Sequence, residues 1–239
     1  MYTPPAYAEH DLTLLQTRMR EWSFATLVTH GARGLNATHL PFLLETEDGN
    51  GQGTLITHLA RANAQFQDLQ AGAQALVIFQ GPHAFISPSW YVNQQTFPTW
   101  NYTAIHVQGQ PTLIEGPEDV LAILQRTVAL YDTPVGGTWT LPAMPWTLVE
   151  PRLRAISGVR IPIETIEGKM KLNQDKTVAD RLGVIAALES QAGEQAREVA
   201  RLIREQPAMR EAVALDQPGP QHVLPPAAIR TPGVTLDRP

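Results

Sequence analysis

The segment THLARAN, residues 57–63, combines side chains that bind a phosphate group. Arg61 offers a planar guanidinium that can hold two oxygens at once, and Thr57, His58 and Asn63 are polar neighbours. The apolar spacing that follows predicts a short helix over residues 61–72, and free N–H groups at a helix start also attract anions. An ordinary helix cap with Arg61 in solvent accounts for the same residues equally well, so both interpretations stay open.

Aromatic residues in the next part of the chain offer flat surfaces for a ring-shaped ligand. They are Trp90, Tyr91, Trp100 and Tyr102. Aromatic side chains near a barrel belong more often to a core or a dimer interface than to a cofactor site. The residues alone leave these roles open.

Three other chemistries find little support. His83, Ser87 and Ser89 lie close together, but without a GxSxG motif or a nearby acid they do not indicate a serine hydrolase. The histidines of the first half are not spaced as metal ligands and cysteine is absent, so we expect no metal site. The GARG and GNGQG segments lack the lysine of a P-loop and are expected to be hairpin turns.

The composition indicates a protein with a real core that is not exported. Of the 239 residues, 43% are hydrophobic. No leader pattern and no apolar run long enough for a membrane span occurs, so we expect a cytoplasmic protein without membrane partners. The net charge of -5 argues against a basic face for DNA, and direct DNA binding stays uncertain.

The elements that must position these residues are mostly strands. Apolar runs between turn residues predict strands over residues 24–30, 39–45, 53–59 and 73–81. Residues 101–115 are expected to form two more strands, broken at Gly109 and Pro111. About six strands of a barrel follow from this pattern.

Helices are predicted for much of the second half. Pro117 and the acids after it predict a helix with one apolar face, composed of Val120, Leu121, Leu124 and Val128. A connection over residues 133–151 leads to a strand within 158–172.

The last part of the chain is expected to begin as helix and to end as a mobile tail. Residues 175–205 carry an apolar stripe, which we place at Val178, Leu182, Ile185 and Leu188. Glu198 and Arg201 are expected to pair on the surface. Residues 206–239 hold seven of the twenty prolines and no long periodic apolar segment, which favours the tail.

Several segments, in this order and spacing, resemble the PaiB-type FMN-binding negative transcriptional regulator family over residues 1–189. They are FATLVTH, NATHLPFLLE, GTLITHLARAN, VIFQGPHAFISPSWY, PTWNYTAIHVQGQP and EGKMKLNQDK. The family is related to pyridoxamine-phosphate oxidases. The resemblance implies an α+β fold built on a six-stranded split β-barrel of Greek-key type with peripheral helices, and a homodimer with FMN between the subunits. We therefore expect an FMN-binding domain over residues 1–189, and a helical extension with a proline-rich tail over 190–239.

The resemblance also implies which residues hold FMN. Thr57, His58, Arg61 and Asn63 match the segment that approaches the FMN phosphate, in agreement with their chemistry. His39, Leu40 and Pro41 match a strand whose backbone follows the edge of the flavin ring. The remaining candidates complete the pocket, in part from the second subunit, or contact anions or the dimer near the last strand: Ser89, Trp90, Trp100, Asn101, Lys171 and Gln174. No catalytic residue is predicted.

The chain departs from the family pattern at two places. Ala64 follows Asn63 where relatives commonly have proline, although a helix can still begin there. Asp175 puts a negative charge beside Gln174, which makes that segment a less secure phosphate contact.

Two functions are compatible with the resemblance. The first is an FMN-binding homodimer that lowers transcription of other genes. The alternative is a split-barrel flavin oxidoreductase that uses FMN on a small molecule or on NAD(P)H, with His39 or His58 near the ring.

Overall fold

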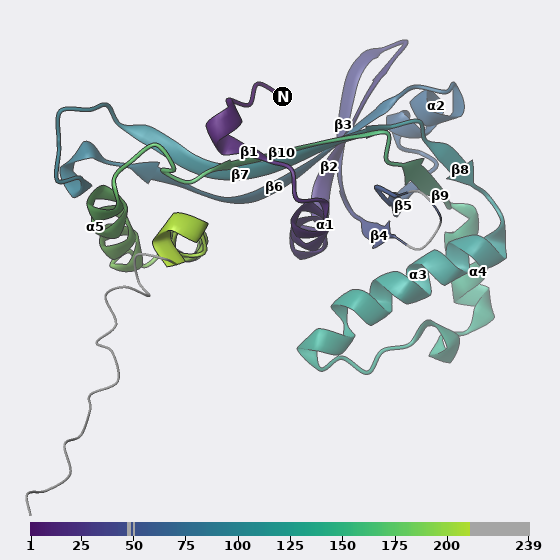
Figure 1. Cartoon of the computed structure of the whole chain (residues 1–239). Helices are drawn as coiled ribbons and strands as arrows, with labels where there is room; N and C mark the ends of the chain where they lie inside the picture. The colour runs from purple at the N-terminus through teal and green to yellow at the C-terminus, as the bar shows by residue number, and fades with distance from the viewer. Residues whose placement is uncertain (47–48, 50, 211–239) are drawn as a thin grey trace, which may run out of the picture.

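The computed structural model describes residues 1–46, 49 and 51–210. Within them ten strands form two antiparallel sheets, and six α-helices surround these sheets (Figure 1). This arrangement confirms the α+β class, with more strands than the sequence indicated. The predicted tail from residue 211 onward and part of the expected turn after residue 45 lie outside the described residues.

The larger sheet has six strands. In spatial order they are β1 (Ala8–Glu9), β10 (Thr165–Lys171), β7 (Thr99–Gly109), β6 (Ala75–Ile86), β2 (Phe24–Gly31) and β3 (Gly34–Pro41). The smaller sheet contains β4 (Leu43–Glu45), β5 (Thr54–Ala60), β9 (Ile156–Pro162) and β8 (Thr112–Ile114). The chain passes between sheets at single residues such as Phe42, which is 2% exposed and separates β3 from β4.

The helices cover selected parts of the sheets. They are α1 (Leu12–Glu21), α2 (Ala64–Gln70), α3 (Pro117–Tyr131), α4 (Trp146–Arg154), α5 (Val178–Glu189) and α6 (Glu194–Arg204). Figure 1 shows α1, α5 and α6 on one side of the long strands, while α3 and α4 form a separate lobe beside the smaller sheet. No described helix has both the length and the apolar character needed to span a bilayer.

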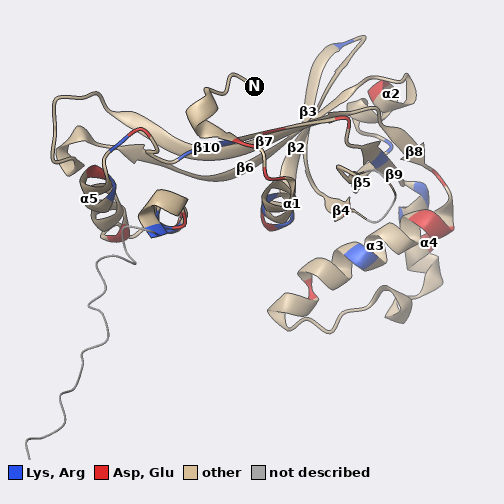
Figure 2. Cartoon of the chain, viewed as in Figure 1, with Lys and Arg blue, Asp and Glu red and all other residues tan. Residues whose placement is uncertain are grey.

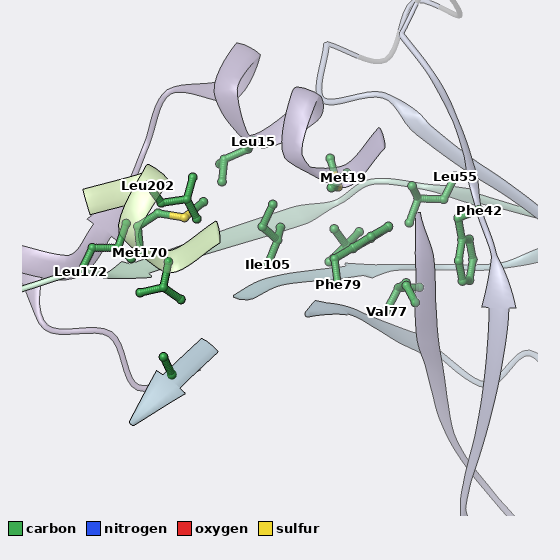
Figure 3. Close-up of a cluster of buried hydrophobic side chains, with 14 of the residues drawn as sticks. Leu15, Met19, Phe42, Leu55, Val77, Phe79, Ile105, Met170, Leu172 and Leu202 are labelled. Atoms are coloured by element: carbon green, nitrogen blue, oxygen red, sulfur yellow. The ribbon is translucent and has the colours of Figure 1, made fainter. Parts of the chain in front are cut away.

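One main hydrophobic core joins both sheets with α1, α5 and α6 (Figure 3). Leu15 and Met19 of α1 face Phe79 and Ile105 of the larger sheet, and Leu55 of the smaller sheet belongs to the same cluster. All five side chains are at most 2% exposed. Burial of this apolar surface is what fixes one face of the six-stranded sheet against the helices.

In the described part of the chain, no α-helix covers the opposite face of the six-stranded sheet. On β2, Phe24, Thr26 and Val28 alternate with the fully or almost fully buried Ala25 and Leu27, as the two-residue period of a strand requires. Figure 1 shows the N-terminal segment as the element that lies against this side of the long strands. We call this surface the open face; its side chains come from β2, β3, β6, β7 and β10.

The open face is also poor in charge along its central strands. Residues 69–114, which include all of β6 and β7, contain no Lys, Arg, Asp or Glu. Figure 2 shows these two strands without blue or red along their length. The centre of the open face is therefore apolar or neutral, whereas soluble surfaces are normally rich in charged side chains.

Three sequence predictions were wrong in detail. Residues 158–172 form two strands, β9 and β10, and these strands belong to different sheets. The strand predicted over residues 73–81 continues as β6 to Ile86, with a β-bulge between Gln80 and His83. The connection over 133–151 contains the start of α4, which tolerates Pro151 because Val149 and Leu153 pack against Val120 of α3.

The predicted apolar stripe of α5 is confirmed at Ile185 and Leu188 and wrong at Val178 and Leu182. Val184, Ile185 and Leu188 are at most 1% exposed, whereas Val178 and Leu182 are 37% and 44% exposed. The helix starts at Val178, so the first predicted position lies at its exposed end. The surface pair of Glu198 and Arg201 is confirmed, with 2.9 Å between Oε2 and Nε.

Candidate functional site

The structure places the thirteen candidate residues in two groups at different ends of the fold. The first, which we call the Arg61 group, comes from β3, β5 and the β5–α2 connection: His39, Leu40, Pro41, Thr57, His58, Arg61 and Asn63. The second, the arm group, comes from the far ends of β7 and β10 and the connection between β6 and β7: Ser89, Trp90, Trp100, Asn101, Lys171 and Gln174. In Figure 1 the arm end of β6 and β7 lies near α5, far from α2.

Arg61 is held in place from several sides. Its Nε donates to the carbonyl oxygen of Ile156 at 3.1 Å, and its guanidinium carbon lies 5.2 Å from the ring centre of Phe66. Its Nη1 forms an ion pair with Oε1 of Glu115 at 2.7 Å. The side chain is still 32% exposed, so its head can meet an anion from solution.

Asn63 caps α2 and takes up one of the free N–H groups that could otherwise bind an anion at the start of the helix. Its Oδ1 accepts from the N–H of Gln65 at 2.9 Å, and its Nδ2 donates to Oγ1 of Thr38 on β3, also at 2.9 Å. The helix has only seven residues, from Ala64 to Gln70. An anion here would depend mainly on Arg61, and less on the helix than the sequence indicated.

Thr57 and His58 point to opposite sides of β5. Thr57 is 1% exposed, and its hydroxyl donates to the carbonyl oxygen of Pro41 at 2.7 Å, which ties β5 to the end of β3. His58 is half-buried, and its buried Nδ1 has no hydrogen-bond partner among the described residues. Burial lowers the pKa of His58, because desolvation disfavours the charged imidazole.

His39 belongs to the open face. It is exposed, its Nδ1 lies 2.9 Å from the hydroxyl oxygen of Thr26, and its ring stacks on Phe24 with 6.4 Å between ring centres. Strand register places Thr26 opposite both His39 and Ile78. Because residues directly opposite each other share a face, His39 and Ile78 lie on the same side of the sheet.

A hollow of about 420 Å³ opens on this same face beside the β-bulge. It is lined by Ile78, Gln80, His83, Trp100, Tyr102, Thr103 and Ala104. Trp100 is 53% exposed, and its ring centre lies 6.1 Å from those of both His83 and Phe85. The size and the mostly apolar lining are within the range of small-molecule sites.

The other members of the arm group differ in exposure. Ser89 is exposed and Trp90 half-buried in the short 3₁₀ helix η2 (Pro88–Trp90), which packs on α5. Lys171 pairs in register with Tyr102, and its Nζ donates to the hydroxyl of Thr99 at 2.5 Å. Gln174 bonds the backbone at Met170 and Leu172.

Asn101 faces the covered side of β7. It is 0% exposed, and neither its Oδ1 nor its Nδ2 has a hydrogen-bond partner among the described residues. Its neighbours in the strand, Trp100 and Tyr102, point to the open face instead. A contact of Asn101 with a ligand stays a prediction.

The structure adds residues that the sequence did not single out. Ile78 and Gln80 line the hollow, and Glu115 forms an ion pair with Arg61. The strand period could have placed Ile78 on the same face as His83 only if the bulge between them had been known. Within the described chain, no three His, Asp or Glu side chains gather closely enough to hold a metal ion.

Solved structures with this fold include flavin proteins. The chain is similar to the FAD and heme binding protein from Mycobacterium smegmatis at 16% identity and a TM-score of 0.51, covering 76% of this chain and 80% of that one. It is also similar to the flavocytochrome Anf3 from Azotobacter vinelandii, at 12% identity and a TM-score of 0.53 over 69% of each chain. At these identities the likeness concerns the fold alone.

Sequence comparison gives a closer relationship. The Bacillus subtilis (strain 168) protein named "Protease synthase and sporulation protein PAI 2" is 32% identical over 208 residues, which cover 86% of this chain and 97% of that protein. Residues 1–165 match the model of a family described as "Putative FMN-binding domain". The chain therefore belongs to this FMN-binding family, with the B. subtilis PAI 2 protein as a full-length relative.

Proposed function

We propose that the protein works as a homodimer in which two copies join through their open faces and enclose FMN between them. The observation that carries the proposal is the open face itself: apart from the N-terminal segment over β10, no described element covers it, and residues 69–114 bring no charged side chain to it. Exposed apolar surface of this kind usually marks an interface or a ligand site. Phe24, Leu35, Phe85 and Trp100 are each at least 47% exposed on its strands.

The residues present fit FMN in two parts. Arg61 suits the phosphate, because a guanidinium forms parallel charge-assisted bonds to phosphate oxygens. The hollow beside Trp100 and His83 suits a flat ring. The two parts lie at different ends of one chain, which favours a site composed of Arg61 from one copy and the arm of the other.

FMN, when bound, supplies electron-transfer chemistry. The chain's own contribution is to hold the phosphate at Arg61, to cover the ring with aromatic side chains and to keep water from it. His39 lies at the margin of this region, with one ring nitrogen engaged by Thr26 and the other available to a neighbour.

We further propose that the FMN-bound dimer acts as a negative regulator of transcription, as the PaiB-type resemblance implies. The name of the B. subtilis relative, which refers to protease synthase and sporulation, agrees with a regulatory role. The net charge of -5 favours regulation through a partner protein over direct binding to DNA. An operator-binding assay at stated salt would overturn the indirect version if the purified dimer alone gave a sequence-specific shift.

The first test is FMN titration of an Arg61→Ala variant. Loss of a charge-assisted phosphate bond should weaken FMN binding by about 1.5–3 kcal/mol. Arg154→Ala is the matched control, because Arg154 is 77% exposed and its one side-chain partner among the described residues is Glu150, one turn away. Unchanged FMN affinity in Arg61→Ala would mean that Arg61 does not bind the phosphate.

The second test asks whether the site is shared between copies. Arg61→Ala and Trp100→Ala variants, each weakened in FMN binding, are mixed so that subunits exchange. A shared site predicts that mixed dimers regain one intact site in two, because one copy supplies Arg61 and the other Trp100. A site made within one chain predicts no recovery, which would contradict this part of the proposal.

A further inference from the structure

We propose that the carboxylate of Glu115 is a built-in competitor for the FMN phosphate, so that FMN binding exchanges one anion for another on Arg61. The inference rests on the proposed phosphate contact of Arg61. It adds Glu115, a residue outside the thirteen candidates, and assigns it an effect on cofactor affinity.

The position of Arg61 does not depend on Glu115. The backbone N–H of Arg61 donates to the carbonyl oxygen of Ala155 at 2.9 Å, and its Nε donates to that of Ile156 at 3.1 Å. The ring of Phe66, which is 9% exposed, lies against the guanidinium. The guanidinium therefore keeps its place when the carboxylate leaves.

Glu115 is placed so that it can leave. It stands between the end of β8 and Gly116, the N-cap of α3, and its side chain is 56% exposed. Among the described residues, Arg61 is its only side-chain partner, through the 2.7 Å contact of Oε1 with Nη1. An exposed ion pair of this kind is weak, since water and salt screen it.

A phosphate dianion is the stronger ligand for the same group. Carboxylate and phosphate both accept parallel N–H bonds from a guanidinium, but phosphate carries more charge and more acceptor oxygens. FMN can therefore displace Glu115, at a cost equal to the broken ion pair. The returning carboxylate would also assist FMN release, so the pair tunes how tightly the cofactor is held.

The test compares FMN with riboflavin, which lacks the phosphate, on flavin-free full-length protein by fluorescence titration. Glu115→Gln should tighten FMN binding about two- to fivefold, the range expected for an exposed ion pair, and leave riboflavin binding unchanged. Glu118→Gln is the matched control, because it removes the same charge three residues away, at another exposed position. In an Arg61→Ala background, Glu115→Gln should have no effect.

The outcomes separate this inference from the proposed function. If FMN binds and Arg61→Ala weakens it while Glu115→Gln changes nothing, the competitor role is wrong and the proposed site stands. Equal tightening by Glu118→Gln would mean a general charge effect and would likewise overturn the inference. If Arg61→Ala leaves FMN affinity unchanged, the phosphate assignment falls and the competitor role falls with it.

Discussion

The two groups of candidate residues are held in opposite ways. In the Arg61 group nearly every polar side chain already has a partner in its own chain: Thr57 bonds Pro41, Asn63 bonds Thr38, and Arg61 pairs with Glu115. In the arm group, Lys171 and Gln174 also have hydrogen-bond partners, but Trp100 is 53% exposed, and its neighbour Phe85 is 47% exposed. Hydrogen bonds hold the polar side chains of the Arg61 group in place. The arm group presents apolar surface that a ligand or a second protein chain could bury.

This difference teaches how the work of binding is divided. Pre-arranged polar groups give orientation at small entropic cost, because their geometry exists before the ligand arrives. Exposed aromatic side chains give affinity through burial, which becomes available when a partner or a ring covers them. Each group by itself would make an incomplete site.

The largest expected effect comes from placing a charge at Trp100, the exposed aromatic residue of the arm group. If the proposed dimer forms, Trp100→Glu should convert it to monomer and weaken FMN binding by more than about 2 kcal/mol, because a carboxylate would be buried without a partner. Sedimentation analysis and FMN titration measure both. Trp146→Glu is the matched control: Trp146 is 55% exposed, close to the 53% of Trp100, but it lies on α4, away from the open face. A dimeric Trp100→Glu protein would refute the open-face interface.

A smaller effect tests the covered side of the same strand. Asn101→Leu should raise the free energy of unfolding by about 1 kcal/mol, because an apolar side chain of similar size replaces a buried amide that has no partner among the described residues. Asn173→Leu is the control and should destabilise, since Asn173 donates to the Tyr91 hydroxyl at 3.1 Å and has a φ of 63° that suits asparagine. Urea unfolding measures both. A more stable Asn101→Leu protein that has lost FMN would show that the amide serves the ligand.

The smallest expected effect concerns pH and the Arg61 group. Burial lowers the folded-state pKa of His58 below the ordinary imidazole pKa of about 6.5. As the pH falls through that value, His58 is protonated in the unfolded chain but stays neutral in the folded chain. Stability should therefore fall as the pH drops through that range, and His58→Leu should remove part of the fall. Thermal unfolding at several pH values between 7.5 and 5 measures the difference. His30→Leu, at an exposed strand position, is the control; an identical pH dependence in His58→Leu and wild type would contradict the argument.

Much of the fold could be predicted from local pattern. Alternation along residues 24–30 and the Pro117 start of α3 are local signals, and both elements form as predicted. The split of residues 158–172 could not be seen, because Val159 and Ile161 belong to one sheet and Met170 to the other, and only tertiary pairing separates them. Packing likewise created α4 despite Pro151.

The candidate site was predictable in chemistry and not in orientation. The type of Arg61 suggests an anion contact, but its pairing with Glu115 joins residues 54 positions apart in sequence. Trp100 and Asn101 are adjacent in a signature segment, yet one faces solvent and the other is enclosed. Sequence proximity cannot tell which of two neighbours in a strand meets a ligand unless the face is known.

The charge-free stretch of β6 and β7 also decides how the protein responds to ionic strength. Salt screens interactions between fixed charges, and residues 69–114 carry none. The proposed association through β6 and β7 should therefore depend less on salt than a phosphate held by Arg61, which should loosen. At high salt the proposed dimer would then stay associated while FMN dissociates. A single salt titration could therefore separate dimerisation from FMN binding.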